Sequence, residues 1–229
     1  MKSVSIIGIG KYLPEKIMTN EDIVRSGIDT SDEWIVERTG IKQRHIIASE
    51  QASSDMALKA SQVALQDAGV SPQEIDLLIV ATSTPDHIVF PSTACILQNK
   101  LGLRTIGSFD ISAACTGFIY AFTTAVQYIK AGYAKKVLVV GSDCLSKYVD
   151  WQDRSVCILF GDGAGAVVLS EGEDGFGVLS STICADGRAE DVLKVDGGGS
   201  KSPFSGDEQK QGQQYIRMDG KAVFKVAIN

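Results

Sequence analysis

Residues 106–118 read IGSFDISAACTGF, an apolar run that leads through small residues to a cysteine and then into a helical pattern. A helix over 113–131 is predicted from the spacing of its apolar residues, which are Phe118, Ile119, Phe122, Val126 and Ile129. Cys115 therefore lies at a strand-to-helix corner, where free amides and the helix dipole favour the thiolate. On position alone, a small buried core residue is as good an interpretation. The small neighbours on both sides leave room for a substrate, so we favour an acylated nucleophile.

Apolar strands alternate with helical patterns over the first 170 residues. Strands are predicted at 4–9, 76–82, 106–111, 136–140 and 164–169, and further helices at 53–68 and from Pro91 to Leu101. Continuous apolar strands separated by helices are typical of a largely parallel sheet covered on both faces. The pattern predicts one layered α/β unit that extends to about residue 170.

An insertion with two short helices is predicted between the first strand and helix 53–68. One helix covers 19–24, and the other begins at Thr30, which has capping-box spacing to Glu33. Trp34 and Arg38 stand one turn apart on the second helix, so both project from one face. From periodicity alone, Trp34 is equally well interpreted as a core residue.

The last third of the chain has a different composition. Residues 176–184 predict a strand, 186–214 a long exposed loop, and 213–228 the start of a helix. The chain stops at Asn229 within that helical pattern, which has an apolar face. We therefore expect the polypeptide to be truncated at its C-terminal end.

Composition excludes several classes of protein. The 229 residues are 44% hydrophobic and 22% charged, with a net charge of −6 and a pI near 5.0, which argues against nucleic-acid binding. No run is long enough to span a membrane, and no signal peptide is evident. Five cysteines without CxxC spacing and two histidines form no metal-site pattern and suit a reducing cytoplasm. We interpret four of these cysteines, Cys95, Cys144, Cys157 and Cys184, as packing residues.

Residues 161–166 read GDGAGA and contain the letters of a dinucleotide-binding fingerprint. That mechanism requires a helix to follow the glycines, whereas the apolar run after residue 166 is typical of a strand. We interpret these glycines as tight backbone packing. His87 in a predicted loop is weak evidence for catalysis, and His45 is predicted on a half-exposed strand.

Several motifs together resemble the β-ketoacyl-acyl-carrier-protein synthase III family of thiolase-like condensing enzymes. They are spread over nearly the whole chain and are specific through their order, reading IIGIG at 6–10, SDEWI at 31–35, RTGI at 38–41, FPS at 90–92, DISAACTGF at 110–118, FGDGAGA at 160–166 and MDGKAVFK at 218–225. The resemblance implies a layered αβαβα fold of two duplicated halves and a cytoplasmic homodimer. Residues 1–170 match the first half, and residues 171–229 match only the beginning of the second.

The resemblance also implies a reaction and its residues. An acyl group moves from acyl-CoA to Cys115, and decarboxylation of malonyl-acyl-carrier protein then supplies the attacking carbanion, with CoA thioester as substrate and no further cofactor. Trp34 and Arg154 match the pair that stacks the CoA adenine, and Thr30 and Arg38 match the CoA entrance. The remaining matches are Phe90, which crosses the dimer interface to the partner's acyl pocket, and Lys225, which docks the acidic carrier protein.

One departure from the family is large. The family's catalytic histidine and asparagine lie in the second half, and neither His45 nor His87 matches, so we expect these 229 residues to lack the decarboxylation machinery. One alternative is a CoA-binding, dimerising fragment without turnover. Another is a related thiolase or polyketide-type condensing enzyme. A dehydrogenase that binds a dinucleotide in a Rossmann fold is the least favoured of the four interpretations.

Overall fold

The computed structural model describes residues 3–173, 176–205 and 212–227. The chain forms two compact units. The first comprises Met1–Pro14, Ile47–Asp143 and Gly163–Ile183, and the second comprises Glu15–Ile46, Cys144–Asp162 and Cys184–Asn229. The boundary predicted at residue 170 separates two duplicated halves of the sequence. The two compact units are defined by contacts in space and do not test that boundary, so it stays a prediction.

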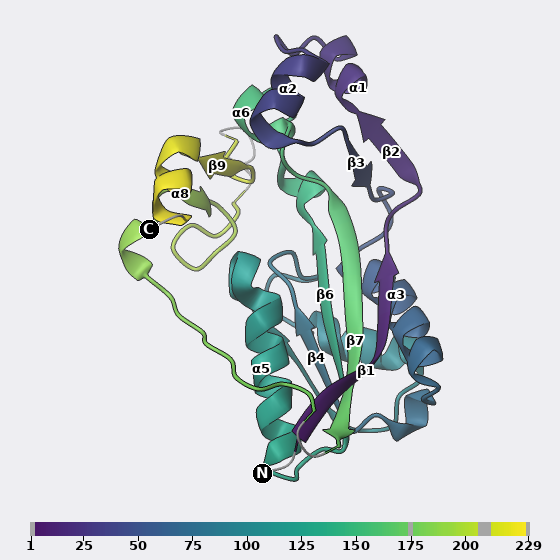
Figure 1. Cartoon of the computed structure of the whole chain (residues 1–229). Coiled ribbons are helices and arrows are strands. Elements are labelled where there is room, and N and C mark those ends of the chain that lie inside the picture. The colour runs from purple at the N-terminus through teal and green to yellow at the C-terminus, as the bar shows by residue number, and fades with distance from the viewer. Residues whose placement is uncertain (1–2, 174–175, 206–211, 228–229) are drawn as a thin grey trace. The chain divides into compact units, whose positions relative to one another are not determined.

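A five-stranded sheet forms the centre of the first unit (Figure 1). Its strands, in the order β1-β7-β6-β4-β5, are β1 (Ser3–Tyr12), β7 (Asp162–Gly172), β6 (Lys136–Cys144), β4 (Leu77–Ala81) and β5 (Gly107–Ile111). β4 pairs in parallel with both β5 and β6, whereas β1 pairs antiparallel with β7. All five β4 residues are buried, which is expected when helices cover both faces of a sheet.

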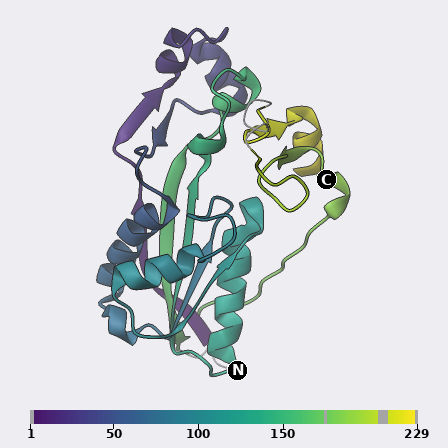
Figure 2. The same ribbon diagram turned by 180° about the vertical axis from the view of Figure 1, so that it is seen from behind.

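Three helices cover this sheet: α3 (Ser53–Ala68), α4 (Thr93–Leu101) and α5 (Gly117–Lys130). α5 lies on one face, and α3 and α4 lie on the other (Figures 1 and 2). Helix α3 ends at Gly69 and α4 at Gly102, both in the left-handed conformation that glycine tolerates. These helices and strands confirm the layered α/β unit predicted from the apolar pattern.

The glycines of β1 allow α3 to pack directly on the strand. A Cβ at Gly10 would lie 2.1 Å from the Ala60 carbonyl oxygen, and one at Gly8 would lie 2.4 Å from that of Ala64. Helix backbone cannot yield at such distances. These two glycines therefore serve close strand–helix packing.

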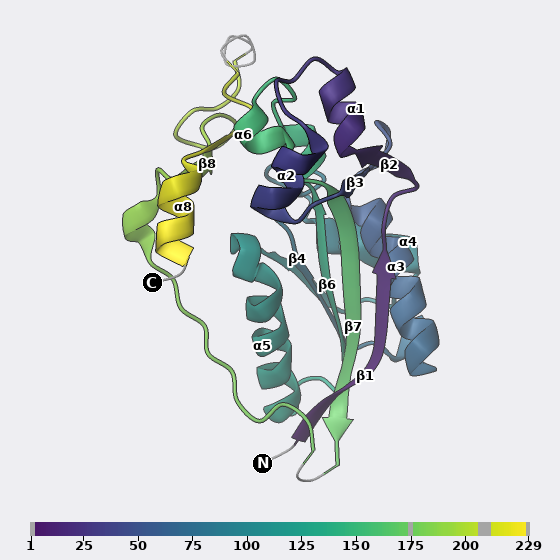
Figure 3. The ribbon, with the colours of Figure 1, turned by 45° about the horizontal axis from the view of Figure 1, so that its top comes forward.

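The second unit is built from short elements around its own core (Figure 3). Its helices are α1 (Asn20–Arg25), α2 (Asp32–Thr39), α6 (Arg154–Cys157) and α8 (Gly220–Ala227). Its strands pair antiparallel as β2 (Lys16–Thr19) with β3 (Gln43–Ile46) and β8 (Leu193–Val195) with β9 (Ile216–Met218). Short 3-10 turns are η1 (Pro72–Glu74) and η2 (Ala114–Thr116) in the first unit, and η3 (Leu145–Tyr148) and η4 (Gly187–Ala189) in the second.

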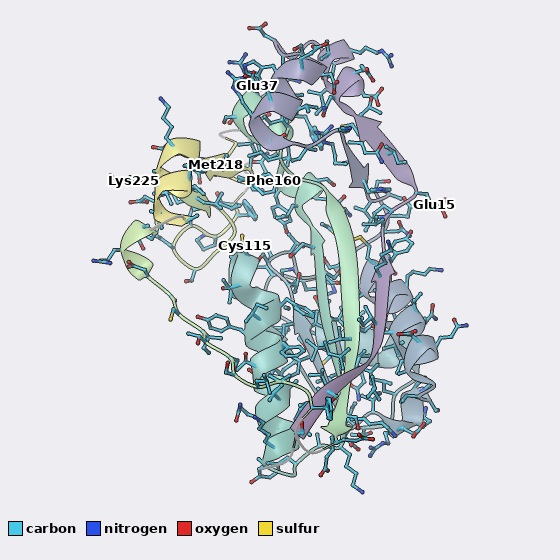
Figure 4. All side chains as sticks on the ribbon, in the orientation of Figure 1. Glu15, Glu37, Cys115, Phe160, Met218 and Lys225 are labelled. Atoms are coloured by element: carbon cyan, nitrogen blue, oxygen red, sulfur yellow. The ribbon has the colours of Figure 1, made fainter. Side chains whose placement is uncertain are left out.

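The core of the second unit joins segments from distant parts of the chain. Its buried members are Ile23, Ile28, Ile35, Val149, Val156, Cys157, Ile158 and Ile216. Trp34, Phe160 and Met218 pack against this core while remaining partly buried, and Figure 4 labels the last two. We call this set the second core.

Three predicted helix starts need correction. The helix predicted from residue 113 begins as an α-helix only at Gly117, after the turn η2. Helix α2 is capped by Ser31, whose hydroxyl accepts from the Trp34 amide, and not by Thr30. Pro91 precedes α4 without joining it, because Ser92 is the N-cap. At Thr30 and Pro91 the adjacent serine is the cap instead, whereas the left-handed Ala114 delays the start of α5.

The predictions for the last third of the chain were partly right: a long stretch of loop and a helix are present, but the strand was wrong and two short strands were missed. Described residues 176–186 form no strand, because a strand needs a continuous hydrogen-bonded neighbour and Val178 alone of these donates to β1, at the Val4 carbonyl. The predicted loop 186–214 contains β8, and the predicted helix from Gln213 begins instead with β9. The helical part is α8, and the predicted end at Ile228 and Asn229 lies outside the described residues.

Candidate active site

Cys115 lies exposed in η2, between the end of β5 and the start of α5 (Figure 4). The Thr116 amide and hydroxyl both donate to the Ala113 carbonyl, at 3.2 and 2.9 Å. These two hydrogen bonds close a tight turn, which places Cys115 just before the start of α5. The predicted strand-to-helix corner is confirmed, with a 3-10 turn where the helix was expected to start.

The residue before the nucleophile candidate has an unusual backbone. Ala114 has φ +45, in the left-handed region that residues with a Cβ avoid at a cost of about 1–2 kcal/mol. Such conformations persist where the surrounding structure enforces them, and they cluster at functional sites. Among the described residues other than glycine, Ala114 is alone in having a positive φ. The strain therefore marks the turn that carries Cys115.

The five cysteines have three different environments. Cys144 and Cys157 are buried, and burial raises the pKa of the Cys157 thiol. Cys95 and Cys184 are exposed, so their interpretation as packing residues was wrong. Of the three exposed cysteines, Cys95 lies in the first turn of α4 and Cys184 in an irregular segment, whereas Cys115 lies in the turn between β5 and α5 and directly follows the left-handed Ala114.

A partly buried carboxylate organises the segment that follows β4. Asp143 Oδ1 accepts from the Thr82 hydroxyl at 3.3 Å, the Ser83 amide at 2.7 Å and the Thr84 hydroxyl at 3.2 Å. The Thr82 amide in turn donates to the carbonyl of Ile111, the last residue of β5. Burial raises the pKa of Asp143. Periodicity did not identify this residue, although a single aspartate at the end of an apolar strand was a visible signal.

A second partly buried carboxylate fixes the start of α4. Asp110 lies on β5 and accepts from the amides of Thr93 and Ala94, at 2.8 and 2.7 Å. Burial raises the pKa of this carboxyl, although both amides favour its ionised form. Asp110 therefore anchors a helix to the strand that leads to Cys115.

The second unit contains a cluster of one tryptophan and two arginines. The Arg38 guanidinium carbon lies 4.3 Å from the centroid of the Trp34 ring, and that of Arg154 lies 4.8 Å from it. Both distances are within the range of cation–π attraction. We call Trp34, Arg38 and Arg154 the arginine–tryptophan cluster.

Local sequence explains two of the three residues of this cluster, and the fold brings in the third. Trp34 and Arg38 are one turn apart on α2, as predicted. Arg154 opens α6, where Asp153 caps the helix by accepting from the Ser155 amide. The Arg154 guanidinium also donates to the Asp29 carbonyl at 2.6 Å.

Thr30 lies in the segment before α2. Its amide donates to the Ile28 carbonyl at 2.8 Å, while its buried hydroxyl has no hydrogen-bond partner among the described residues. A buried hydroxyl without a partner costs about 1–3 kcal/mol, which a bound ligand could recover.

The other predicted site residues are exposed. Phe90, in the segment before α4 in the first unit, is 80% exposed. Lys225 lies on α8 of the second unit (Figure 4). His45 lies on β3 and is partly exposed, as predicted, and His87 is exposed in a loop.

The glycine-rich motif at 161–166 continues into β7, so the prediction of a strand is confirmed. A Cβ at Gly161 would lie 2.9 Å from the Arg44 Cβ, and one at Gly163 would lie 3.1 Å from a Leu13 methyl group. These glycines serve close packing. Separately, none of the helices in the described part of the chain is both long and apolar enough to cross a bilayer.

Comparison with known proteins points to one family. The family model of 3-oxoacyl-[acyl-carrier-protein (ACP)] synthase III matches residues 109–187. The chain is 51% identical over 224 residues to a β-ketoacyl-[acyl-carrier-protein] synthase III of Methylococcus capsulatus, covering 98% of this chain and 67% of the relative. It therefore spans about two thirds of that relative's length.

Two solved structures extend this result. The 3-oxoacyl-[acyl-carrier-protein] synthase III of Aquifex aeolicus matches with a TM-score of 0.86 and 48% identity, over 97% of this chain and 67% of that one. A priming β-ketosynthase from the R1128 polyketide biosynthetic pathway matches with a TM-score of 0.88 and 33% identity, over 99% of this chain and 66% of that one. The predicted thiolase-like α/β fold is confirmed.

Proposed function

Because the chain belongs to the β-ketoacyl-[acyl-carrier-protein] synthase III family, we propose that it initiates fatty-acid synthesis by joining an acyl group from acyl-CoA to malonyl-acyl-carrier protein. The observation that carries the mechanism is the exposed Cys115 in a strained turn at the mouth of α5. Amides at a helix N-terminus favour negative charge, and small neighbours leave space for a thioester.

The reaction has two steps. The Cys115 sulfur attacks the thioester carbonyl of acyl-CoA, the bond from that carbonyl to the CoA sulfur breaks, and CoA leaves as its thiol with the proton of Cys115. In the second step of the family's reaction, which uses a histidine and an asparagine that these 229 residues do not match, the malonyl group loses carbon dioxide and the carbon left behind attacks the Cys115 thioester. The bond from the acyl group to sulfur breaks, and the sulfur takes up one proton as the 3-oxoacyl-carrier protein is released.

The arginine–tryptophan cluster is the proposed binding site for the adenine end of CoA. The Trp34 indole and the Arg154 guanidinium offer flat faces that can stack on the adenine, and Arg38 lines the entrance of the site. Arg38 and Arg154 hold Trp34 from two different helices, so the cluster is organised before any ligand arrives. Thr30, which the resemblance places at the CoA entrance, lies in the segment directly before α2.

A homodimer is also proposed. Ile88, Val89 and Phe90 are 61%, 76% and 80% exposed, and they form an apolar loop that water solvates poorly. β5 is an edge strand, with β4 as its only neighbour in the described sheet. Both features suit an interface in which Phe90 reaches the partner's acyl pocket. Carrier-protein docking at Lys225 and a cytoplasmic location complete the proposal.

Acylation of Cys115 tests the mechanism. The protein is incubated with acetyl-CoA, and peptide mapping by mass spectrometry locates the acetyl group. We expect one acetyl group on Cys115, none in Cys115→Ala, and unchanged labelling in Cys95→Ser, which removes another exposed thiol. Acylation at a different residue, or none at any, contradicts the assignment.

The likeness to the priming β-ketosynthase favours a second candidate, the same condensation used to start a polyketide. The chemistry at Cys115 is the same in both, so the experiment must compare acceptors. Condensation rates with carrier proteins from fatty-acid and polyketide synthesis separate the two. We favour the fatty-acid reaction because the identity to relatives with that name is higher.

A further inference from the structure

We propose that Arg44 is a positioning residue, which holds the helix of Trp34 and the helix of Arg154 in register so that the arginine–tryptophan cluster keeps its geometry. The inference deepens the proposed function and rests on the CoA role assigned to this cluster. Arg44 lies on β3, and in the described structure the guanidinium groups stacked on Trp34 are those of Arg38 and Arg154, not that of Arg44.

Arg44 is a buried cation held by neutral oxygens. It is 5% exposed, and its guanidinium donates to the Met18 carbonyl at 3.2 Å, the Asn20 side-chain oxygen at 2.8 Å and the Ile158 carbonyl at 3.0 Å. Its Nε has no partner in the described structure. Burial lowers the pKa of this guanidinium, because it removes water from the charged group. A buried charge is tolerated only where hydrogen bonds replace its hydration, so these three bonds hold Arg44 and its partners in place.

One arm of the Arg44 contacts leads to α2. Asn20 is 1% exposed, and while its oxygen accepts from Arg44, its amide nitrogen donates to Asp32 at 2.7 Å and to the Ile41 carbonyl at 2.8 Å. Asp32 is the first residue of α2, and Ile41 follows the end of this helix. Asn20 therefore holds both ends of the helix that carries Trp34 and Arg38.

The other arm leads to α6. Ile158 is the C-cap residue of α6, whose first residue is Arg154. The same Arg44 nitrogen, Nη2, donates to both Asn20 and Ile158, although Arg44 and Ile158 are 114 residues apart in the chain. One side-chain nitrogen thus links the two helices that supply the cluster.

This geometry predicts a specific pattern of coupling. Removing the guanidinium leaves the Asn20 and Ile158 oxygens unpaired and frees α6 to shift relative to α2. The contact of Arg154 with Trp34 should be lost, whereas that of Arg38 should remain because both residues are on α2. The effect of changing Arg44 should therefore overlap with loss of Arg154 and add to loss of Arg38.

The test is a double-mutant cycle in the whole enzyme, with the CoA dissociation constant per folded molecule as readout. We expect Arg44→Met to raise the CoA dissociation constant about fivefold to tenfold. The double variant Arg44→Met/Arg154→Ala should have a dissociation constant similar to that of Arg154→Ala alone. In Arg44→Met/Arg38→Ala, by contrast, the fold-changes of the two single variants should multiply. Ile23→Ala is the matched control, because it removes buried volume from the second core without touching these bonds. It should lower the urea midpoint and leave CoA affinity unchanged.

The conservative variant Arg44→Lys keeps the charge but cannot reach both oxygens with a planar fork, so it should restore stability more than affinity. It carries the test if Arg44→Met does not fold. The proposal is overturned if both variants bind CoA within twofold of the unchanged protein. It is also overturned if the fold-changes of Arg44→Met and Arg154→Ala multiply fully in the double variant.

A readout without CoA separates this proposal from the proposed function. The protein has two tryptophans, so fluorotryptophan labelling gives two ¹⁹F resonances, and Trp34→Phe assigns them. The Trp34 resonance should move in Arg44→Met and Arg154→Ala but not in Ile23→Ala. If it moves while no cluster variant alters CoA affinity, the ligand assignment is wrong and the positioning role stands. If it does not move, the positioning role is wrong.

Discussion

Replacing Trp34 by alanine should weaken CoA binding by more than tenfold. Stacking of a base on an aromatic side chain contributes about 1–3 kcal/mol, and a tenfold loss of affinity corresponds to about 1.4 kcal/mol. The change also removes the surface on which Arg38 and Arg154 rest at 4.3 and 4.8 Å. Both guanidinium groups then lose their fixed positions, so a loss above tenfold is the expected result.

The same change should cost stability, because Trp34 packs partly against the second core. Complete burial of an aromatic ring gives losses of about 3–5 kcal/mol on truncation, so a partly buried ring should give about 1–3 kcal/mol. CoA affinity must therefore be measured by titration calorimetry on protein shown to be folded, together with urea denaturation of each variant.

Trp151 provides a matched control. It also packs partly against the second core, whereas both recorded cation–π contacts are made to Trp34. Trp151→Ala should lose similar stability with little change in CoA affinity. If Trp34→Ala loses stability while its affinity per folded molecule stays the same, Trp34 is a core residue and the proposed site is wrong.

Three further predictions concern the first unit and the cysteines. Limited iodoacetamide labelling followed by peptide mapping should modify Cys115 before the buried Cys157, and the reverse order in folded protein would refute the assigned nucleophile. Gly10→Ala should lower the free energy of unfolding by about 2–3 kcal/mol in urea denaturation. Gly165→Ala is the control, because its Cβ would lie 4.0 Å from the nearest atom, and it should change the free energy of unfolding little. Equal urea midpoints for the two variants would contradict the packing argument. Because burial raises the folded-state pKa of Asp143, its contribution to stability should increase as the pH falls through that pKa and level off below the unfolded value. Asp143→Asn retains the accepting Oδ1 and should abolish this dependence in urea midpoints measured from neutral pH to pH 4; an unaltered slope would refute the reasoning.

Local patterns were sufficient for elements whose start and end signals lie in adjacent residues. The helix at 53–68 was predicted with its observed bounds, because its apolar spacing and the glycine at its end act within a few residues. The placement of Cys115 at a strand-to-helix corner has the same origin. By contrast, β8 and β9 are short strands stabilised by each other, and no local signal reports that pairing.

The candidate site divides in the same way. Trp34 and Arg38 were predicted to share a helix face, because a spacing of four residues brings side chains together whatever the rest of the chain does. Arg154 entered only through the resemblance, and its contact with Trp34 depends on how distant segments pack. The left-handed backbone of Ala114 also had no signal in its residue type.

The sequence by itself determined the family, the sheet-forming strands of the first unit and the helix that presents Trp34, since each depends on residue order or on spacings of a few residues. Only the tertiary structure decided that Arg44 would be buried and bonded to Ile158, that Asp143 would accept from the Ser83 amide, and that Arg154 would reach Trp34. These contacts join residues far apart in the chain. Their energies come from desolvation and from hydrogen bonds that exist only after the segments have packed, so no local pattern can encode them.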